Sequence, residues 1–300
     1  MKNQLLGISM VFVFFSCAKP PEKKISKLDE KLKVITVNYP LFYFAERIGG
    51  ELIDLSYVIP NDIDPAFWNP DEEALKHYQA ADVIFKNGAD YAKWMNNVSL
   101  ASSRIVNTAS SFENDLIRLN STSSHSHGPE GQHEHEDRAF TVWLDLELAL
   151  KQAEAIRAHL VKKIPNQSKL MDQNFEKLKK DLFLVHDQLL FAGKKFDNQL
   201  IIGSHPVYQY LARAYNLNVK SVHFEPNQFP SAGQWSKLDD LIKKNGSSIM
   251  LWENQPSTQN ENELNKRKVK AIVFNPCGNR PNKGDFLSIM RENTKAILNQ

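Results

Sequence analysis

The stretch Asn198–Phe224, NQLIIGSHPVYQYLARAYNLNVKSVHF, predicts the fold because it contains a complete strand–helix–strand unit. Its first part, NQLIIGS, is a short apolar run typical of a buried strand, and VKSVHF at its end has the composition of a second strand. Between them, HPVYQYLARAYNL has the length and composition of a helix. Because two strands joined by a crossover helix run parallel, this unit predicts a parallel sheet covered by helices.

The same alternation continues on both sides of this unit. Toward the C-terminus it predicts strands at 247–253 and 269–275, and helices at 231–246, 260–268 and 285–300. Toward the N-terminus it predicts strands at 33–38, 52–60, 82–88 and 104–109, and helices at 40–50 and 143–164. Two halves that each repeat strand and helix predict an α/β fold with two lobes, each built on a mostly parallel sheet.

A long helix lies between the two halves and is expected to join them rigidly. Its apolar residues recur mostly every three or four positions, which predicts a buried face made of Leu170, Phe175, Leu178, Leu182, Val185 and Leu189. The expected organisation is an N-terminal lobe at 33–163, a linking helix at 164–196 and a C-terminal lobe at 197–300. Ligands bind such folds at the carboxyl ends of the strands, so the site is expected between the lobes.

A further helix is predicted to begin near Pro70. Asn69 is a suitable N-cap, and Pro70 suits the first helical position because its missing N–H would be unpaired there in any case. The acidic residues Asp71, Glu72 and Glu73 complement the positive end of the helix dipole. The helix is therefore expected to be capped by the Asn69 side chain.

The N-terminus has the features of an export signal. A short basic head precedes the apolar run LLGISMVFVFFSC, which ends at Cys17 and is shorter than the roughly 20 apolar residues that span a bilayer. Because VFFSC is similar to a bacterial lipoprotein box, we predict a signal peptide at 1–17 and anchoring to the lipid bilayer through Cys17. An ordinary signal peptide is the alternative. Residues 18–32, rich in Pro and Lys, are predicted to form a flexible tether.

Composition excludes several functions. The 300 residues are 42% hydrophobic, which suffices for a sizeable core, and 37 basic against 35 acidic residues give a net charge of only +2. We therefore expect no nucleic-acid partner. The only cysteines are Cys17 and Cys277, so a chain lipidated at Cys17 has no internal disulfide. The sequence contains no nucleophile elbow, phosphate loop or H-E-x-x-H motif, so we expect a protein that is not an enzyme. We also expect it to be a monomer.

A histidine-rich loop is predicted at 121–138. Within it, HSHGPEGQHEHED carries four imidazoles, those of His125, His127, His133 and His135, interleaved with Gly, Pro and acids. Closely spaced imidazoles on a segment without fixed geometry predict weak zinc binding, and a solvated linker is the alternative. The other histidines outside this loop, apart from His205, have no mutual spacing pattern and are expected at the surface: His77, His159, His186 and His223.

Four stretches in this order resemble the zinc/manganese-type substrate-binding proteins of bacterial ABC importers. DPAFWNPDEEALKHYQAADVIFKNG, from Asp64, is similar to the family's D-P-H-x-x-x-P stretch with a following A-D-L-V-V-Y-N-G. TVWLD, from Thr141, looks like the family's H-V-W-L-D. IIGSHPVYQYLARAYNL, from Ile201, and IMLWENQPS, from Ile249, are similar to H-D-A-F-x-Y-L-A-x-x-Y-G-L and I-F-x-E-P-Q-x-S.

The resemblance implies a lipoprotein that captures zinc, manganese or another divalent metal in its cleft and passes it to an ABC permease, without an organic cofactor. It also implies four metal ligands, most of which this sequence lacks. Ala66 and Thr141 stand at two of the family's histidine positions, and Asn275 or Pro276 at its carboxylate position. Only His205 matches a ligand.

Other residues near these positions could hold the metal instead. The candidates beside His205 are Glu253, Asp64 and Cys277, with Asp62 also nearby. Their structural interpretations are a turn for the two aspartates and for Glu253, and a core position for Cys277. The cleft is expected to be lined by Ala66, Phe67, Trp68, Thr141, Trp143 and Asn275, although both tryptophans also suit packing. This aromatic cleft favours the alternative function, a diverged relative that binds a non-metal or chelated ligand or acts in surface docking or adhesion.

Overall fold

The computed structural model describes residues 30–119, 138–225 and 228–300. Residues 31–300 form one compact unit. The predicted signal peptide with Cys17, nearly all of the tether and the histidine-rich loop lie outside the described residues. In the described part, no helix is both long enough and apolar enough to cross a membrane.

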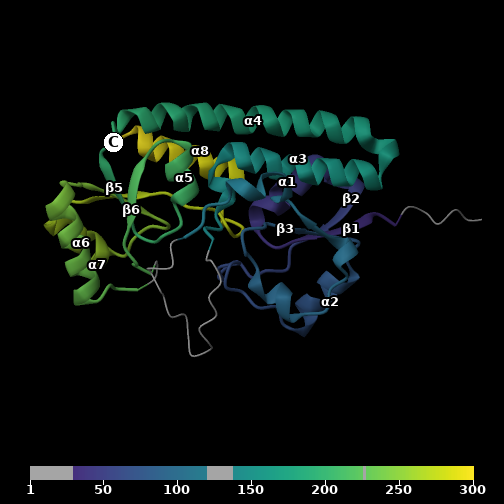
Figure 1. The fold of residues 1–300 in the computed structure, drawn as a ribbon, viewed down its shortest axis with the longest axis horizontal. Helices are drawn as coiled ribbons and strands as arrows, with labels where there is room; N and C mark the ends of the chain where they lie inside the picture. Colours follow the sequence, from purple (N-terminus) through teal and green to yellow (C-terminus); the bar gives the residue numbers. More distant parts are fainter. Residues whose placement is uncertain (1–29, 120–137, 226–227) are drawn as a thin grey trace, which may run out of the picture. The chain divides into compact units, whose positions relative to one another are not determined.

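The first sheet has four parallel strands in the order β2-β1-β3-β4 (Figure 1). The strands are β1 (Leu32–Thr36), β2 (Ile53–Ser56), β3 (Val83–Lys86) and β4 (Ile105–Asn107). The helices α1 (Tyr39–Gly49) and α2 (Glu72–Ala80) lie between its strands in the sequence. The central strands β1 and β3 are the most apolar, since both of their faces are buried.

The second sheet repeats this topology, with four parallel strands in the order β6-β5-β7-β8. They are β5 (Leu200–Gly203), β6 (Asn218–Ser221), β7 (Ile249–Trp252) and β8 (Lys270–Val273). The helices are α5 (Gln209–Ala214), α6 (Ala232–Asn245), α7 (Thr258–Lys266) and α8 (Phe286–Leu298). The predicted α/β fold with two parallel sheets is confirmed.

Two consecutive helices, joined by a short turn, lie in the sequence between the strands of the first sheet and those of the second. They are α3 (Leu146–Lys163) and α4 (Ser168–Lys195), and α4 packs against α1, α3 and α8. The buried face of α4 includes five of the six predicted residues, but the prediction for Leu170 was wrong because its side chain is 43% exposed. Met171 is buried in its place, since one residue turns the helix by about 100° and Met171 continues the stripe through Phe175 and Leu178.

The start of α2 also differs from the prediction. The N-cap is Asp71 and not Asn69: the Asp71 Oδ1 atom accepts a hydrogen bond of 2.8 Å from the backbone N–H of Ala74. Pro70 therefore precedes the helix. An aspartate cap combines a hydrogen-bond acceptor with a negative charge at the positive end of the helix, which explains why the helix begins at Glu72.

The equivalent edges of the two sheets differ in polarity. In each sheet the strand order reverses beside the first strand, between β1 and β3 and between β5 and β7, and crevices for ligands form at such points. In the first sheet this point is filled by Asn38, whose Nδ2 donates to Asn87 Oδ1 at 3.2 Å, and by Gln152, whose Nε2 donates to the same oxygen at 3.1 Å. In the second sheet, ionisable side chains follow the strands instead.

Candidate functional site

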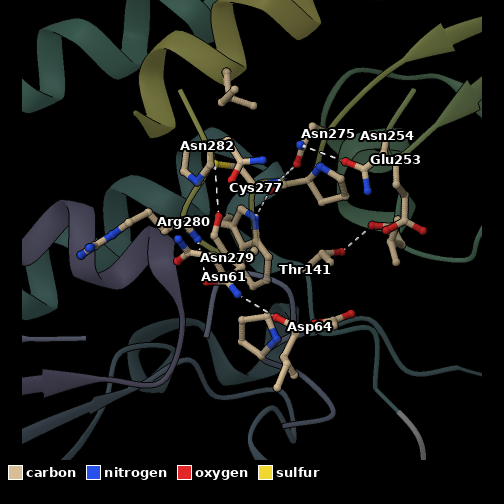
Figure 2. A pocket seen from close by; sticks show the side chains of 18 of the residues that line it. Asn61, Asp64, Thr141, Glu253, Asn254, Asn275, Cys277, Asn279, Arg280 and Asn282 are labelled. Atoms are coloured by element: carbon tan, nitrogen blue, oxygen red, sulfur yellow. Dashed lines mark hydrogen bonds between the residues drawn. The ribbon is translucent and has the colours of Figure 1, made fainter. Parts of the chain in front are cut away.

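A pocket of about 990 Å³ lies where loops from both sheets meet (Figure 2). One side comes from the loop at 61–67, after β2, and from Thr141 and Trp143, before α3. The other side comes from residues that follow the four strands of the second sheet: His205 after β5, Glu225 after β6, Glu253 after β7 and Asn275 after β8. The site therefore lies at the carboxyl ends of the strands, as the fold predicts.

His205 follows β5 in a tight turn. The backbone N–H of Ser204 donates to the carbonyl of Leu251, and the carbonyl of His205 accepts from the N–H of Val207 at 2.9 Å. Since α5 begins only at Gln209 and is capped at Tyr208, His205 does not cap this helix. The turn instead places the imidazole in the pocket wall.

Glu253 and Asp64 bring negative charge into the pocket from different sheets. Burial, followed by the negative charges of Asp64 and Glu225, raises the pKa of the Glu253 carboxyl from 4.5 to about 7. Its Oε1 atom is buried and accepts no hydrogen bond in the described part of the chain. Burial also raises the pKa of Asp64, although the Ala66 N–H donates to its Oδ1 at 2.9 Å and the charge of His205 opposes the shift. These carboxyl groups are therefore held close to one another.

His223 and Glu225 are two residues that the sequence analysis did not assign to the site. Glu225 lines the pocket, and the His223 ring lies 6.0 Å from the His205 ring between centroids. The prediction of a surface position was wrong for His186, which is 8% exposed, whereas His223 is half-buried beside His205. The sequence did contain a pattern that places His223 and Glu225 near His205. Because β5 and β6 are adjacent parallel strands, the residues that follow them meet at one edge of the sheet.

Cys277 and Asn275 take structural positions at the pocket wall. The Cys277 side chain is buried, and burial raises the pKa of its thiol, which disfavours the thiolate that metals bind. Asn275 braces the turn that holds it: the Asn275 Oδ1 atom accepts from the Cys277 N–H at 2.7 Å, and its Nδ2 donates to Asn254 Oδ1 at 3.4 Å.

Thr141 and Ala66 supply little to a cation. Thr141 is buried, and its hydroxyl donates to the carbonyl of Val207 at 2.5 Å, which joins the two sides of the pocket. Ala66 is not among the residues that line the pocket. Asp62 lies in the exposed loop at the pocket wall.

The aromatic residues divide between the pocket and the core. Phe67, which is 58% exposed, and Trp143, whose Nε1 donates to the carbonyl of Pro276 at 2.7 Å, both line the pocket. The prediction that Trp68 lines the cleft was wrong: it is 7% exposed and packs edge-on against Trp94 at 5.9 Å between ring centroids. Packing against Trp94 offers Trp68 more apolar contact than the polar pocket does.

The ionisable residues of the pocket do not form a closed cage. Within residues 30–119, 138–225 and 228–300, no three His, Cys, Asp or Glu side chains are placed to hold one metal ion together. His205, Glu253 and Asp64 are thus neighbours in one pocket, and Cys277 is a buried residue of its wall.

Comparison with known proteins identifies a common family. The family model ZnuA, described as zinc-uptake complex component A, periplasmic, matches residues 34–300. The zinc-binding lipoprotein AdcA of Streptococcus pneumoniae is 26% identical over 313 residues, which cover 99% of this chain and 60% of the relative. The high-affinity zinc uptake system protein ZnuA of Bacillus subtilis is 26% identical over 286 residues, covering 89% of this chain and 87% of the relative. This chain thus spans about 60% of the length of AdcA.

Solved structures show the same fold. The metal-dependent lipoprotein YcdH of Bacillus subtilis has a TM-score of 0.77 at 23% identity, covering 90% of this chain and 99% of that one. The Zn(II)-bound ZnuA-like domain of Streptococcus pneumoniae AdcA has a TM-score of 0.76 at 21% identity, covering 90% of this chain and 98% of that one. At these identities the likeness establishes two parallel sheets in two lobes joined by a long helix.

Proposed function

The chain belongs to the ZnuA family of zinc-uptake components, and on this premise we propose that it captures zinc or a related divalent metal outside the cytoplasm for an ABC importer. It acts as a binding protein and not as an enzyme. Its partners are the metal ion and a membrane permease, and its predicted anchor is the lipid on Cys17. The lobes at 33–163 and 197–300, joined by the helix at 164–196, enclose the cleft.

One observation carries this proposal: three carboxyl groups and an imidazole meet in one pocket. Burial and, after it, the negative charges of Asp64 and Glu225 raise the pKa of Glu253, so the carboxylate is poorly solvated and repelled by its neighbours in the metal-free protein. A divalent cation removes this repulsion, because each carboxylate then faces a positive charge. Imidazole nitrogen and carboxylate oxygen are also ligands that zinc accepts.

We assign the metal to His205 and Glu253, with Asp64 facing them from the loop after β2. His205 and Glu253 follow β5 and β7, the two strands at the crevice of the second sheet. Glu225 and His223 are the nearest further donors. Because these side chains form no cage in the described part of the chain, capture requires them to turn toward the ion within the pocket.

The experiment must separate the cleft from the histidine-rich loop. We therefore start from a variant in which His125, His127, His133 and His135 are replaced by Ala, and titrate it with zinc by competition calorimetry. We expect one zinc per chain. Adding His205→Ala should weaken this binding at least tenfold, because the imidazole is the best neutral donor in the pocket.

His77→Ala in the same background is the matched control, since His77 is an exposed histidine of α2. Its zinc affinity should equal that of the parent. Equal affinities for the His205→Ala and His77→Ala variants would show that the metal lies elsewhere.

A further inference from the structure

We propose that the cleft takes its metal as a complex with a small polycarboxylate chelator. The metal occupies the end formed by His205 and Glu253, and the chelator's free carboxylates face Arg280 and Lys283 at the other end. This inference rests on the proposed metal-binding function and specifies the form in which the metal arrives.

The first argument is the number of metal ligands. No three ligating side chains of the described residues are placed around one ion. The neighbours of His205 at the family's other ligand positions are Ala66, the hydrogen-bonded hydroxyl of Thr141 and the amide of Asn275. Zinc takes four or more ligands, and because no three of the pocket's imidazoles and carboxylates are placed around one ion, these side chains as they stand leave positions open. A chelator bound to the same ion fills these positions with its own oxygen or nitrogen atoms.

The second argument is the size and lining of the pocket. Its volume of about 990 Å³ is at the upper end of the range of pockets that enclose an organic ligand, about 300–1,000 Å³, and far exceeds the space of one ion. The amides of Asn254 and Asn282 and the exposed ring of Phe67 line it. An amide wall with an aromatic edge suits a polar organic molecule, which hydrogen-bonds to the amides and rests against the ring.

The third argument is the cationic end of the pocket. All residues of 278–284 line it, and this segment carries Arg280 and Lys283. The Arg280 guanidinium lies over two rings, 4.7 Å from the centroid of Phe42 and 5.5 Å from that of Tyr57, which fixes its position. In the described part of the chain no carboxylate lies within ion-pair distance of either cation.

The positions of these groups separate the two ends. Figure 2 shows Arg280 and Asn282 on one side of the pocket and Glu253 with Asn254 on the other, with the Arg280 side chain extending away from Glu253. Glu292 of α8 and, from the loop at 61–67, Asp62 and Asp64 also line the pocket, and none of them lies within ion-pair distance of Arg280 or Lys283 in the described residues. A guanidinium held in a fixed orientation binds a carboxylate through two parallel hydrogen bonds, so the cationic end suits an anionic group.

The test measures whether the protein retains a chelator together with zinc. Full-length protein with the four loop histidines replaced by Ala is dialysed against radiolabelled citrate or radiolabelled nitrilotriacetate, each with and without one equivalent of zinc. We expect zinc-dependent retention of at least one of the two chelators, at one per chain. Arg280→Gln/Lys283→Gln should weaken this retention at least tenfold and leave the affinity for zinc alone within threefold.

Arg291→Gln is the matched control, because Arg291 is a partly exposed arginine of α8 that does not line the pocket. It should retain the chelator as the parent does. Retention of neither chelator, or equal retention by the double variant and the Arg291→Gln control, overturns this inference. If zinc alone then binds in a manner that depends on His205, the proposed function stands without the chelator. If the protein binds zinc neither alone nor together with a chelator, both the proposed function and this inference are wrong.

Discussion

Glu253 shows how a single side chain prepares the cleft for the cation that we propose it binds. Its carboxyl group follows β7, its Oε1 atom is buried without a hydrogen bond in the described part of the chain, and two other carboxyl groups face it. A buried, repelled carboxylate costs folding free energy when no cation is bound. The sequence pointed to Glu253 and His205 through their motif positions. It did not identify Glu225 and His223, whose proximity depends on the pairing of β5 with β6.

Replacing Glu253 by Gln should stabilise the metal-free protein at pH 8. The pKa of Glu253 in the folded protein, about 7, lies above its usual value of 4.5, so the folded state holds this proton more tightly than the unfolded state. Wild-type stability is therefore lost as pH rises from about 4.5 through 7, and the variant escapes this loss. We expect a gain on the order of 1–3 kcal/mol at pH 8 and little change at pH 4.5, measured by urea unfolding with EDTA present.

Glu51→Gln is the control for this prediction, since Glu51 is exposed and remote from the pocket wall. It should leave the unfolding free energy unchanged at both pH values. A Glu253→Gln variant that is less stable than wild type at pH 8 would mean that Glu253 makes favourable contacts that outweigh its repulsion.

At the scale of the elements, local sequence was sufficient to predict most strands and helices, because each of them is specified by residues close together in the chain. The eight strands of the described residues all overlap segments that the alternation predicts as strands, and α4 has the expected stripe. Two errors concern single positions: Asp71 caps α2 in place of Asn69, and Met171 is buried in place of Leu170. A third concerns length, because the helix expected over 205–217 is α5, which spans only Gln209–Ala214. The two errors at single positions depend on a choice between residues one or two positions apart, which periodicity alone does not decide.

The stripe of α4 allows a direct test of this packing. Leu178→Ala should lower the free energy of unfolding by about 2–5 kcal/mol, because Leu178 is completely buried where α4 packs against other helices. Leu184→Ala changes the same residue type on the same helix, but Leu184 is 60% exposed and should change stability by less than about 0.5 kcal/mol. Urea unfolding measures both. Similar losses in the two variants would mean that a further surface covers the exposed side of α4.

At the scale of the whole molecule, the cleft arises from two sheets of the same strand order whose loops meet. Hydrogen bonds cross it: the Thr141 hydroxyl donates to Val207, and Asn279 Nδ2 donates to the carbonyls of Pro60 and Ile63, at 2.6 and 2.7 Å. The sequence predicted the position of the cleft, because parallel strands direct their carboxyl ends to one edge. For Trp68 and Cys277 it left both a position in the cleft and a position in the core open, because the choice depends on packing between distant segments.

The identity of the atoms that bind the metal tests the proposed cleft site most directly. Zinc K-edge X-ray absorption on the variant without loop histidines, loaded with one equivalent of zinc, reports these atoms. We predict scattering from one or two imidazoles and from oxygen, with no sulfur at about 2.3 Å, and loss of imidazole scattering in the His205→Ala variant. Zinc bound through sulfur would place Cys277 in the site, and imidazole scattering unchanged by His205→Ala would contradict the assignment of the cleft.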